Sequence, residues 1–179
     1  MSLIESVNHS TTPSSSSSST SASPTLRARI YDLLSTPADP TATLARVVLA
    51  LVLFPHGAQH LLGWFGGYGF AGTHDWMRNV VGIPGPIAAV SIILEFFGPL
   101  LLLAGFASRP IALALGVFMA VAASTHSANG FFMNWFGNQR GEGFEYHLLA
   151  IALAAVVALR GGGAWSVDRF LLKSQEDHS

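Results

Sequence analysis

Four apolar runs, separated by short polar segments, dominate the chain from about residue 44 onward. Each run approaches the length of about 20 residues that a helix needs to cross the hydrocarbon core of a bilayer. The runs lie at about residues 44–62, 86–105, 110–127 and 144–159. This pattern predicts an all-α fold, namely an integral membrane four-helix bundle.

The N-terminal part of the chain has a different pattern. It contains an uninterrupted serine run at positions 14–19 and too few large apolar residues to offset the entropy lost on ordering. We therefore predict a disordered Ser-rich tail over residues 1–40. Within it, the apolar positions of residues 26–34 have the spacing of a short interfacial helix, although a chance cluster in a linker fits equally well. We place the membrane domain at residues 41–172 and a polar C-terminal tail at residues 173–179.

Composition agrees with a membrane protein. Half of the residues are apolar and 11% are charged, whereas an ordinary soluble domain is about 25% charged. The chain has no cysteine, which excludes disulfides, thiolate-bound iron–sulfur clusters and c-type haem attachment. The formal net charge is −1 with no basic cluster, so we expect no nucleic acid partner. The expected partner is the lipid bilayer.

The basic residues predict how the bundle is oriented in the membrane. With four spans, only Arg78 and Arg140 fall on one side. The opposite side holds Arg27, Arg29, Arg46, Arg109, Arg160, Arg169 and Lys173. We therefore expect a multi-pass protein of the bacterial cytoplasmic (inner) membrane with both termini in the cytoplasm.

Ionisable side chains inside the predicted spans are the main functional signal, because such groups are costly in lipid and commonly mark a site. At about 1.5 Å per residue along a helix, His56 and Glu95 fall near the midplane of the membrane. The outer half or its edge holds His60, His126, Glu145 and His147. All four spans therefore contribute to one outward-facing polar pocket.

We interpret His56 and Glu95 as the catalytic pair, since a carboxylate at mid-depth needs a partner and an imidazole on the neighbouring span can supply it. The alternative for this pair is a purely structural tie between helices. The candidates for cofactor binding are His60, His126, Glu145 and His147. For His60, Glu145 and His147, simple contact with interfacial water explains the pattern equally well.

Three kinds of ligand fit such a pocket. A quinone needs hydrogen bonds to its carbonyl groups, a proton route and flat apolar walls. We expect the walls to come from Phe96, Phe97, Phe131 and Trp135. A metal ion would find imidazole and carboxylate ligands, and a haem could be held between two histidines. Ligand chemistry favours the three in that order, because no Glu-x-x-His metal motif is present.

Several short motifs follow one another in order across the four predicted spans. They include His56-Gly57, Gln59-His60-Leu61, Gly82-Ile83-Pro84, Glu95 with Gly98, His126 with Gly130-Phe131-Phe132, and Glu145-Tyr146. In their order and spacing over about residues 44–172 they resemble the DoxX family of small four-helix membrane proteins. That family is similar in part to the DoxD subunit of thiosulfate:quinone oxidoreductase. The resemblance implies a quinone-linked redox role, but His60 stands where a lysine is common, so it does not extend to thiosulfate.

Two functions follow from these expectations. The first is a membrane subunit of a quinone-linked oxidoreductase that binds and protonates quinone in the outward-facing pocket. The alternative is a non-catalytic membrane anchor or scaffold that recruits soluble redox enzymes, in which the polar groups only fix helix registry. A soluble redox partner and a homo-oligomer are both compatible with the sequence.

Overall fold

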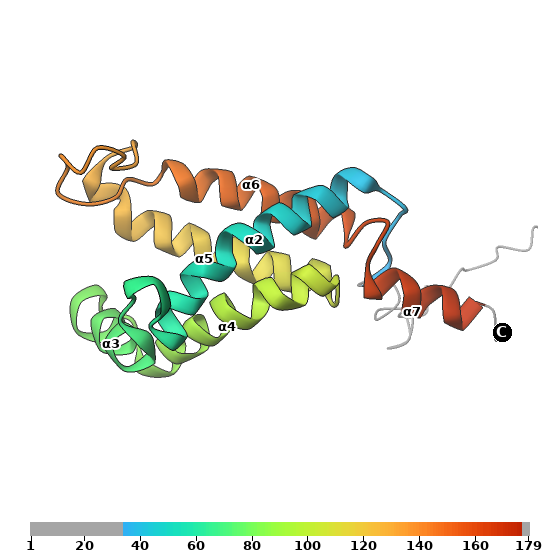
Figure 1. Ribbon diagram of the computed structural model, residues 1–179, viewed down its shortest axis with the longest axis horizontal. Coiled ribbons are helices and arrows are strands. Elements are labelled where there is room, and N and C mark those ends of the chain that lie inside the picture. Colours follow the sequence, from blue (N-terminus) through green and yellow to red (C-terminus); the bar gives the residue numbers. More distant parts are fainter. Residues whose placement is uncertain (1–33, 177–179) are drawn as a thin grey trace, which may run out of the picture.

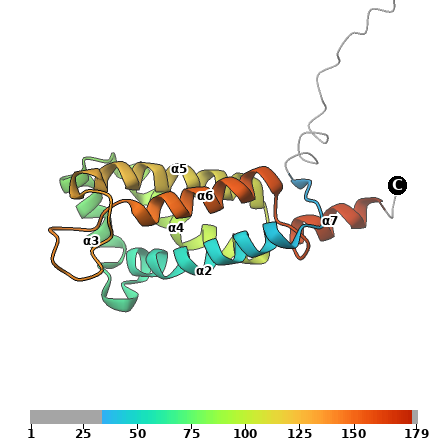
Figure 2. The same ribbon diagram turned by 90° about the horizontal axis from the view of Figure 1, so that it is seen from above.

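The computed structural model describes residues 34–176, and within this range helices are the only regular secondary structure. Four long helices run side by side along the long axis of the molecule (Figures 1 and 2). They are α2 (Pro40–Leu62), α4 (Gly85–Ala104), α5 (Ser108–His126) and α6 (Glu145–Arg160). The predicted all-α four-helix bundle is thus confirmed. Residues 1–33 of the tail predicted at residues 1–40, and with them most of the interfacial helix at residues 26–34, lie outside the described residues.

Shorter elements lie at the two ends of the bundle (Figure 1). One end, here called the α3 end, carries the 3₁₀ turns η1 (Trp64–Gly66) and η3 (Ser127–Asn129), helix α3 (Gly69–Trp76) and the π-helix η2 (Met77–Val81). It also carries the loop that connects α5 to α6. The opposite end, the α7 end, carries α7 (Val167–Glu176), so the helix extends into the predicted C-terminal tail.

The four long helices form a closed ring of contacts in which α2 packs mainly on α4 and α5 mainly on α6. Small side chains at the buried positions let the helices approach closely. The core contains Ala45, Ala50, Ala112, Ala150 and Ala154 together with Leu49, Leu53, Leu102, Leu115 and Val157. This core leaves large apolar side chains on the outer faces of the helices.

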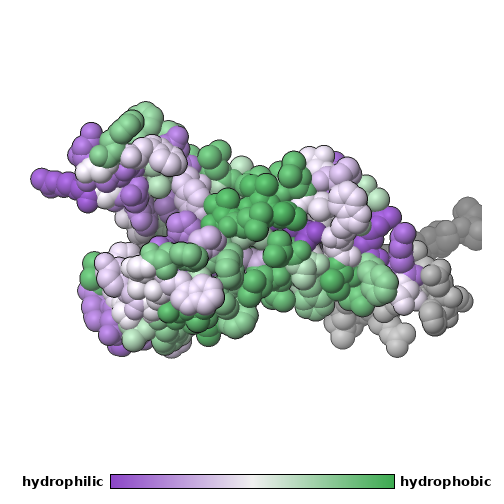
Figure 3. Space-filling model, viewed as in Figure 1, coloured by the Kyte–Doolittle hydropathy of each residue, from purple (hydrophilic) through white to green (hydrophobic). Residues whose placement is uncertain are grey.

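The outer surface is apolar around the middle of the bundle, where Figure 3 shows a broad hydrophobic band. Exposed side chains include Leu51, Val90, Leu113, Val117 and Leu149. Within residues 34–176, three helices are long and apolar enough to cross a membrane, at Pro40–Leu62, Gly85–Ala104 and Ser108–Asn129. The fourth, α6, has 16 residues, or about 24 Å, and packs between α5 and α2. The apolar helices imply contact with the lipid bilayer.

The closest approach that positions the polar groups is made by Gly57 on α2. A methyl group placed on Gly57 would lie 2.2 Å from the carbonyl oxygen of Glu95 and 2.6 Å from Cα of Phe96. Only a glycine allows the two backbones to touch in this way. The carbonyl of Glu95 is also the one that loses its helical donor to Pro99, so the contact with Gly57 covers an acceptor that α4 leaves open.

At the α7 end, a buried arginine ties three segments together. The Arg46 side chain, 2% exposed, donates from Nε to the carbonyl of Gly162 (2.8 Å) and from Nη2 to that of Trp165 (2.6 Å). Its Nη1 donates to the carbonyls of Leu102 and Leu103 in the last turn of α4. Arg46 therefore satisfies carbonyls that the end of a helix leaves without intrahelical donors.

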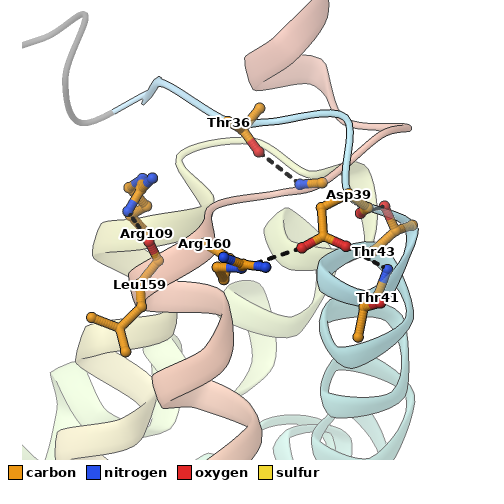
Figure 4. A network of polar contacts seen from close by, with 8 residues as sticks. Thr36, Asp39, Thr41, Thr43, Arg109, Leu159 and Arg160 are labelled. Atoms are coloured by element: carbon orange, nitrogen blue, oxygen red, sulfur yellow. Dashed lines mark hydrogen bonds and ion pairs between the residues drawn. The ribbon is translucent and has the colours of Figure 1, made fainter.

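Further polar contacts close the same end (Figure 4). Arg109 donates from Nη1 to the carbonyls of Ala158 and Leu159 at the end of α6, at 3.0 and 2.5 Å. Asp39 accepts a 2.8 Å hydrogen bond from the backbone amide of Thr41 as the N-cap of α2, and its carboxylate lies 3.3 Å from Nε of Arg160. Residues 35–40, which we expected to belong to the disordered tail, are therefore packed on the bundle and begin α2.

Candidate functional site

A cavity of about 260 Å³ lies between the long helices toward the α3 end. All four long helices contribute to it, as the sequence predicted, and η2 closes one side. Its polar lining consists of His56, His60, Glu95, Thr125, His126, Glu142, Tyr146 and His147. Its apolar lining consists of Trp76, Met77, Val81, Ile83, Phe118, Met119, Val121, Ala122 and Met133. Five of the six predicted site residues thus meet at one cavity.

The central polar contact joins α2 to α4. Nδ1 of His60 lies 2.5 Å from Oε2 of Glu95, and the Glu95 side chain is only 3% exposed. We expected His56 to be this partner. Because α2 meets α4 most closely at Gly57, the residue almost one turn further along, His60, reaches the carboxylate. The ring of His56 instead lies 5.5 Å from the ring of Tyr146 on α6.

A second cluster of rings forms the opposite wall of the cavity. The rings of His126 and His147 are 4.8 Å apart, and the ring of Tyr146 is 5.5 Å from that of His147. Nδ1 of His126 lies 2.8 Å from the carbonyl oxygen of Ala122. Since a carbonyl only accepts hydrogen bonds, Nδ1 carries the proton and Nε2 of His126 is the acceptor.

Two buried polar atoms of this cluster have no hydrogen-bond partner among the residues that the structure describes. They are the hydroxyl oxygen of Tyr146 and Nδ1 of His147. An unsatisfied buried polar group costs about 1–3 kcal/mol. The two atoms therefore remain unsatisfied polar groups within residues that line the cavity.

Glu145 is the predicted site residue that does not line the cavity. Its Oε2 accepts a hydrogen bond of 3.3 Å from the backbone amide of Met133 and so fixes the loop between α5 and α6. Glu142 takes its place in the lining and is itself held by the amide of Asn134 at 2.8 Å. Glu142 could not be identified from the sequence, because a loop residue has no helical periodicity from which its direction can be inferred.

The prediction of which aromatic residues form the walls of the cavity was wrong. None of Phe96, Phe97, Phe131 and Trp135 lines the cavity. Phe96 packs on Phe54 with the ring centroids 5.5 Å apart, and Phe97 is 50% exposed. Successive residues of a helix point about 100° apart, so the two residues after Glu95 face away from it. The walls come instead from Phe118, Met119, Tyr146 and the segment that contains η2.

The π-helix η2 shapes the side of the cavity opposite α6. Met77 and Val81, the first and last residues of η2, both line the cavity, and Met77 is only 5% exposed. A π turn is rare and occurs frequently at functional sites. The pattern of apolar and polar residues in the sequence does not indicate this wider turn.

Within residues 34–176, no group of three or more His, Cys, Asp or Glu side chains converges as a set of metal ligands. The imidazoles of His126 and His147 pack on each other, which leaves no space for a haem between them.

A helical membrane bundle with a histidine paired to a buried glutamate beside a cavity defines the class of this protein as a polytopic membrane protein with a polar site between its spans. Residues 41–135 match the DoxX family model, and the chain belongs to the DoxX family. It is 33% identical over 111 residues to the inner membrane protein YqjF of Escherichia coli (strain K12). The aligned residues cover 62% of this chain and 81% of that relative. No solved structure matches the chain.

The family match bears on the cavity in a specific way. The matched residues 41–135 include the four site residues on α2, α4 and α5, namely His56, His60, Glu95 and His126. They end before α6, which contributes Tyr146 and His147. The buried pair thus lies inside the matched region, whereas the second wall of the cavity is completed from outside it.

Proposed function

We propose that this protein is the membrane subunit of a quinone-linked oxidoreductase and that the cavity holds the quinone head group. The observation that carries the proposal is the contact between His60 and the buried carboxylate of Glu95, which lies on the wall of the cavity. An ion pair kept only for packing is often no more stabilising than apolar residues. A pair that opens onto a cavity can also hold and deliver protons.

The size and lining of the cavity suit one aromatic head group. Its volume of about 260 Å³ is just below the range of roughly 300–1,000 Å³ typical of drug-sized ligands. Phe118, Met77 and Met119 provide apolar surface, and Tyr146 adds an aromatic side chain to the lining. A bound quinone would supply two-electron, two-proton redox chemistry at its two carbonyl groups. The electrons would come from a donor protein.

The cavity also reaches the lipid-facing surface, which a quinone with an isoprenoid tail would require. Val121 lines the cavity and is 48% exposed on the outer face of α5, and Trp76 lines it and is 46% exposed. A head group entering between these side chains would leave its tail in the hydrocarbon region. We infer that the ligand enters from the bilayer.

Protons would enter from the α3 end. Glu142 lines the cavity from an exposed loop position, and Thr125 lines it from the exposed end of α5. The His60–Glu95 pair shares a hydrogen bond deeper inside. In this proposal the pair holds the proton that the head group receives, while His56 and His126 orient the head group by hydrogen bonds.

We further propose that the protein lies in the bacterial inner membrane, as the name of its relative suggests, with both termini in the cytoplasm. The chain contains no native cysteine, so single cysteines can test the topology directly. A cysteine at Phe65, near the α3 end, should react with an impermeant maleimide added to intact spheroplasts. A cysteine at Lys173 should react only after lysis, and the reverse pattern would overturn the orientation.

The first test of the quinone proposal is solvent extraction of the purified protein and quantification of the quinone it retains. The wild type in native lipid should carry near-stoichiometric quinone, and Glu95→Gln should lose most of it. Asp75→Asn is the matched control, because Asp75 is an exposed acid outside the cavity lining. Equal quinone in wild type and Glu95→Gln, or none in well-folded wild type, would reject the site.

The second candidate function is a membrane anchor that recruits soluble redox enzymes. It is favoured by the aromatic loop at the α3 end, where Phe132, Trp135 and Phe136 are 67%, 78% and 90% exposed. An anchor should tolerate joint replacement of His60 and Glu95 by glutamine without loss of its cellular phenotype, provided that the protein still inserts. Loss of the phenotype in that variant, with the protein at wild-type abundance in the membrane, would exclude the anchor.

A further inference from the structure

A second recess lies at the α7 end, far from the histidine cavity. It is an open groove of about 460 Å³ between the end of α4 and helix α7. Two cations, Arg169 and Lys173, and two aromatic rings, Trp165 and Phe170, line it beside Ala104, the last residue of α4. A groove that combines cations with aromatic and apolar surface favours an amphipathic anionic ligand.

The walls of this groove are fixed by buried polar contacts. Asp168, only 1% exposed, accepts hydrogen bonds from the backbone amides of Ala107 (2.7 Å) and Ser108 (2.9 Å) at the start of α5. Its own amide donates to the carbonyl of Gly105 at 3.0 Å. The hydroxyl of Ser166 caps α7 by accepting from the amide of Arg169 at 3.3 Å. The first turn of α7 is therefore anchored to the bundle.

Both charged side chains that line the groove, Arg169 and Lys173, are cationic. The nearby carboxylate of Asp168 is turned inward onto the backbone amides of α5. Among the residues that the structure describes, the Arg169 guanidinium makes one long contact, 3.5 Å from Nη1 to the carbonyl of Thr36, and its other donors have no partner there. Arg169 and Lys173 are one helical turn apart and thus share a face. The groove therefore presents positive charge.

The groove is continuous with the lipid-facing surface of α4. Leu100 and Leu103 precede the groove residue Ala104 in the chain and are 38% and 46% exposed. Phe106 follows it and is 44% exposed. Trp165 and Phe170 are 75% and 72% exposed at the same end, where aromatic rings commonly mark the membrane–water interface. A ligand in the groove would have its head beside the cations and its apolar part along α4.

We propose that this groove binds an anionic phospholipid, with the phosphate between Arg169 and Lys173 and the acyl chains along the outer face of α4. Basic pockets beside membrane helices recognise anionic head groups in this way. The apolar surface that adjoins the groove distinguishes this ligand from a free phosphate ion, which would need only the cations.

Native mass spectrometry of the purified full chain tests the proposal, with phosphatidylglycerol and phosphatidylcholine of identical acyl chains as probes. The wild type should prefer phosphatidylglycerol. A cation near a membrane surface contributes about fivefold in affinity for anionic lipid, so the double variant Arg169→Gln/Lys173→Gln should lose about 30-fold for phosphatidylglycerol alone. Arg140→Gln, which removes a cation at the α3 end, is the matched control and should bind both lipids as the wild type does.

Two further variants keep the test decisive if the double variant folds poorly. The charge-conserving exchange Arg169→Lys/Lys173→Arg should retain the preference. Phe170→Ser leaves both cations in place and should weaken binding of both lipids alike. Equal binding of the two lipids by the wild type, an unchanged preference in the double variant, or displacement of phosphatidylglycerol by equimolar inorganic phosphate would each overturn the proposal.

Discussion

Nδ1 of His60 lies 2.5 Å from Oε2 of Glu95, across the contact between α2 and α4. The carboxylate is buried, so this imidazole is the group that offsets the cost of removing it from water. The same pair lines the cavity between the four long helices. It therefore has a structural role between two helices and, in our proposal, a chemical role toward a ligand.

The structural role can be measured with a double-mutant cycle. Replacing His60 by leucine leaves the Glu95 carboxyl buried without this partner, and we expect a loss of about 3–5 kcal/mol in the free energy of unfolding. The double replacement His60→Leu/Glu95→Leu removes both polar groups and should recover most of that loss. Denaturant unfolding in detergent gives the free energies, and strictly additive effects would contradict a direct interaction.

Gly57 should be intolerant of a side chain. In Gly57→Ala the new methyl group would lie 2.2 Å from the Glu95 carbonyl oxygen, so α2 and α4 must separate. We expect a cost of about 1–3 kcal/mol from overpacking and a parallel loss of quinone retention, since His60 moves with α2. Gly116→Ala is the control, because its nearest neighbour is the Ala154 methyl group at 3.3 Å. If both variants are equally stable, the proposed close contact is not important.

Arg46 should be irreplaceable at the α7 end. Arg46→Met leaves the carbonyls of Gly162, Leu103 and Trp165 without their donor, and we expect a loss of about 3 kcal/mol or more. Arg46→Lys should restore little of it, because an ammonium cannot reproduce the planar fork of a guanidinium. The thermal unfolding temperature reports the effect. The exposed residue Arg140 provides the control, and Arg140→Met should unfold as the wild type does.

Stability at the start of α2 should depend on pH. Desolvation raises the pKa of the Asp39 carboxyl, but hydrogen bonds from the backbone amides of Thr41 and Ala42 and the charge of Arg160 outweigh it, so the pKa lies below its ordinary value of 3.8. A lowered pKa means that the stabilisation is complete above 3.8 and disappears as the pH falls through the folded-state value.

Asp39→Asn should therefore unfold at a lower temperature than the wild type near neutral pH. The two proteins should converge once the pH is below the folded-state pKa of Asp39, because the wild-type carboxyl is then neutral as well. Thermal unfolding followed by circular dichroism at both pH values checks this. A difference that persists unchanged into acid would assign the effect to shape rather than charge.

The sequence predicted the fold well because the apolar runs are long and their ends are marked. The predicted spans at residues 86–105, 110–127 and 144–159 differ from α4, α5 and α6 by one or two residues at each end. The start of α2 was placed four residues late, since its N-cap, Asp39, lies in a stretch that looked like tail. Asp39 followed by Pro40 is a good start signal, but the serine-rich composition before it obscured this.

The sequence predicted the depth of the site residues in the membrane but not the direction in which their side chains point. Rise per residue placed His56 and Glu95 near the midplane and His60, His126 and His147 in the outer half or at its edge, and the structure brings all five to one cavity. Which imidazole meets Glu95 depends on how α2 rotates against α4, and that is fixed by the tertiary contact at Gly57. The same rotation turns Phe96 and Phe97 away from the cavity.

The arginines at the α7 end would act both during membrane insertion and after the helices have packed. During insertion, Arg46, Arg109 and Arg160 are charges in short loops or at helix ends, and they would retain their side of the membrane in the cytoplasm. Once the helices have packed, Arg46 and Arg109 donate to the last carbonyls of α4 and α6, and Arg160 pairs with Asp39. In the proposed orientation, a chain inserted the other way round would have to carry the same cations across the bilayer before it could close its helix ends, so topology and completed folding would depend on the same side chains.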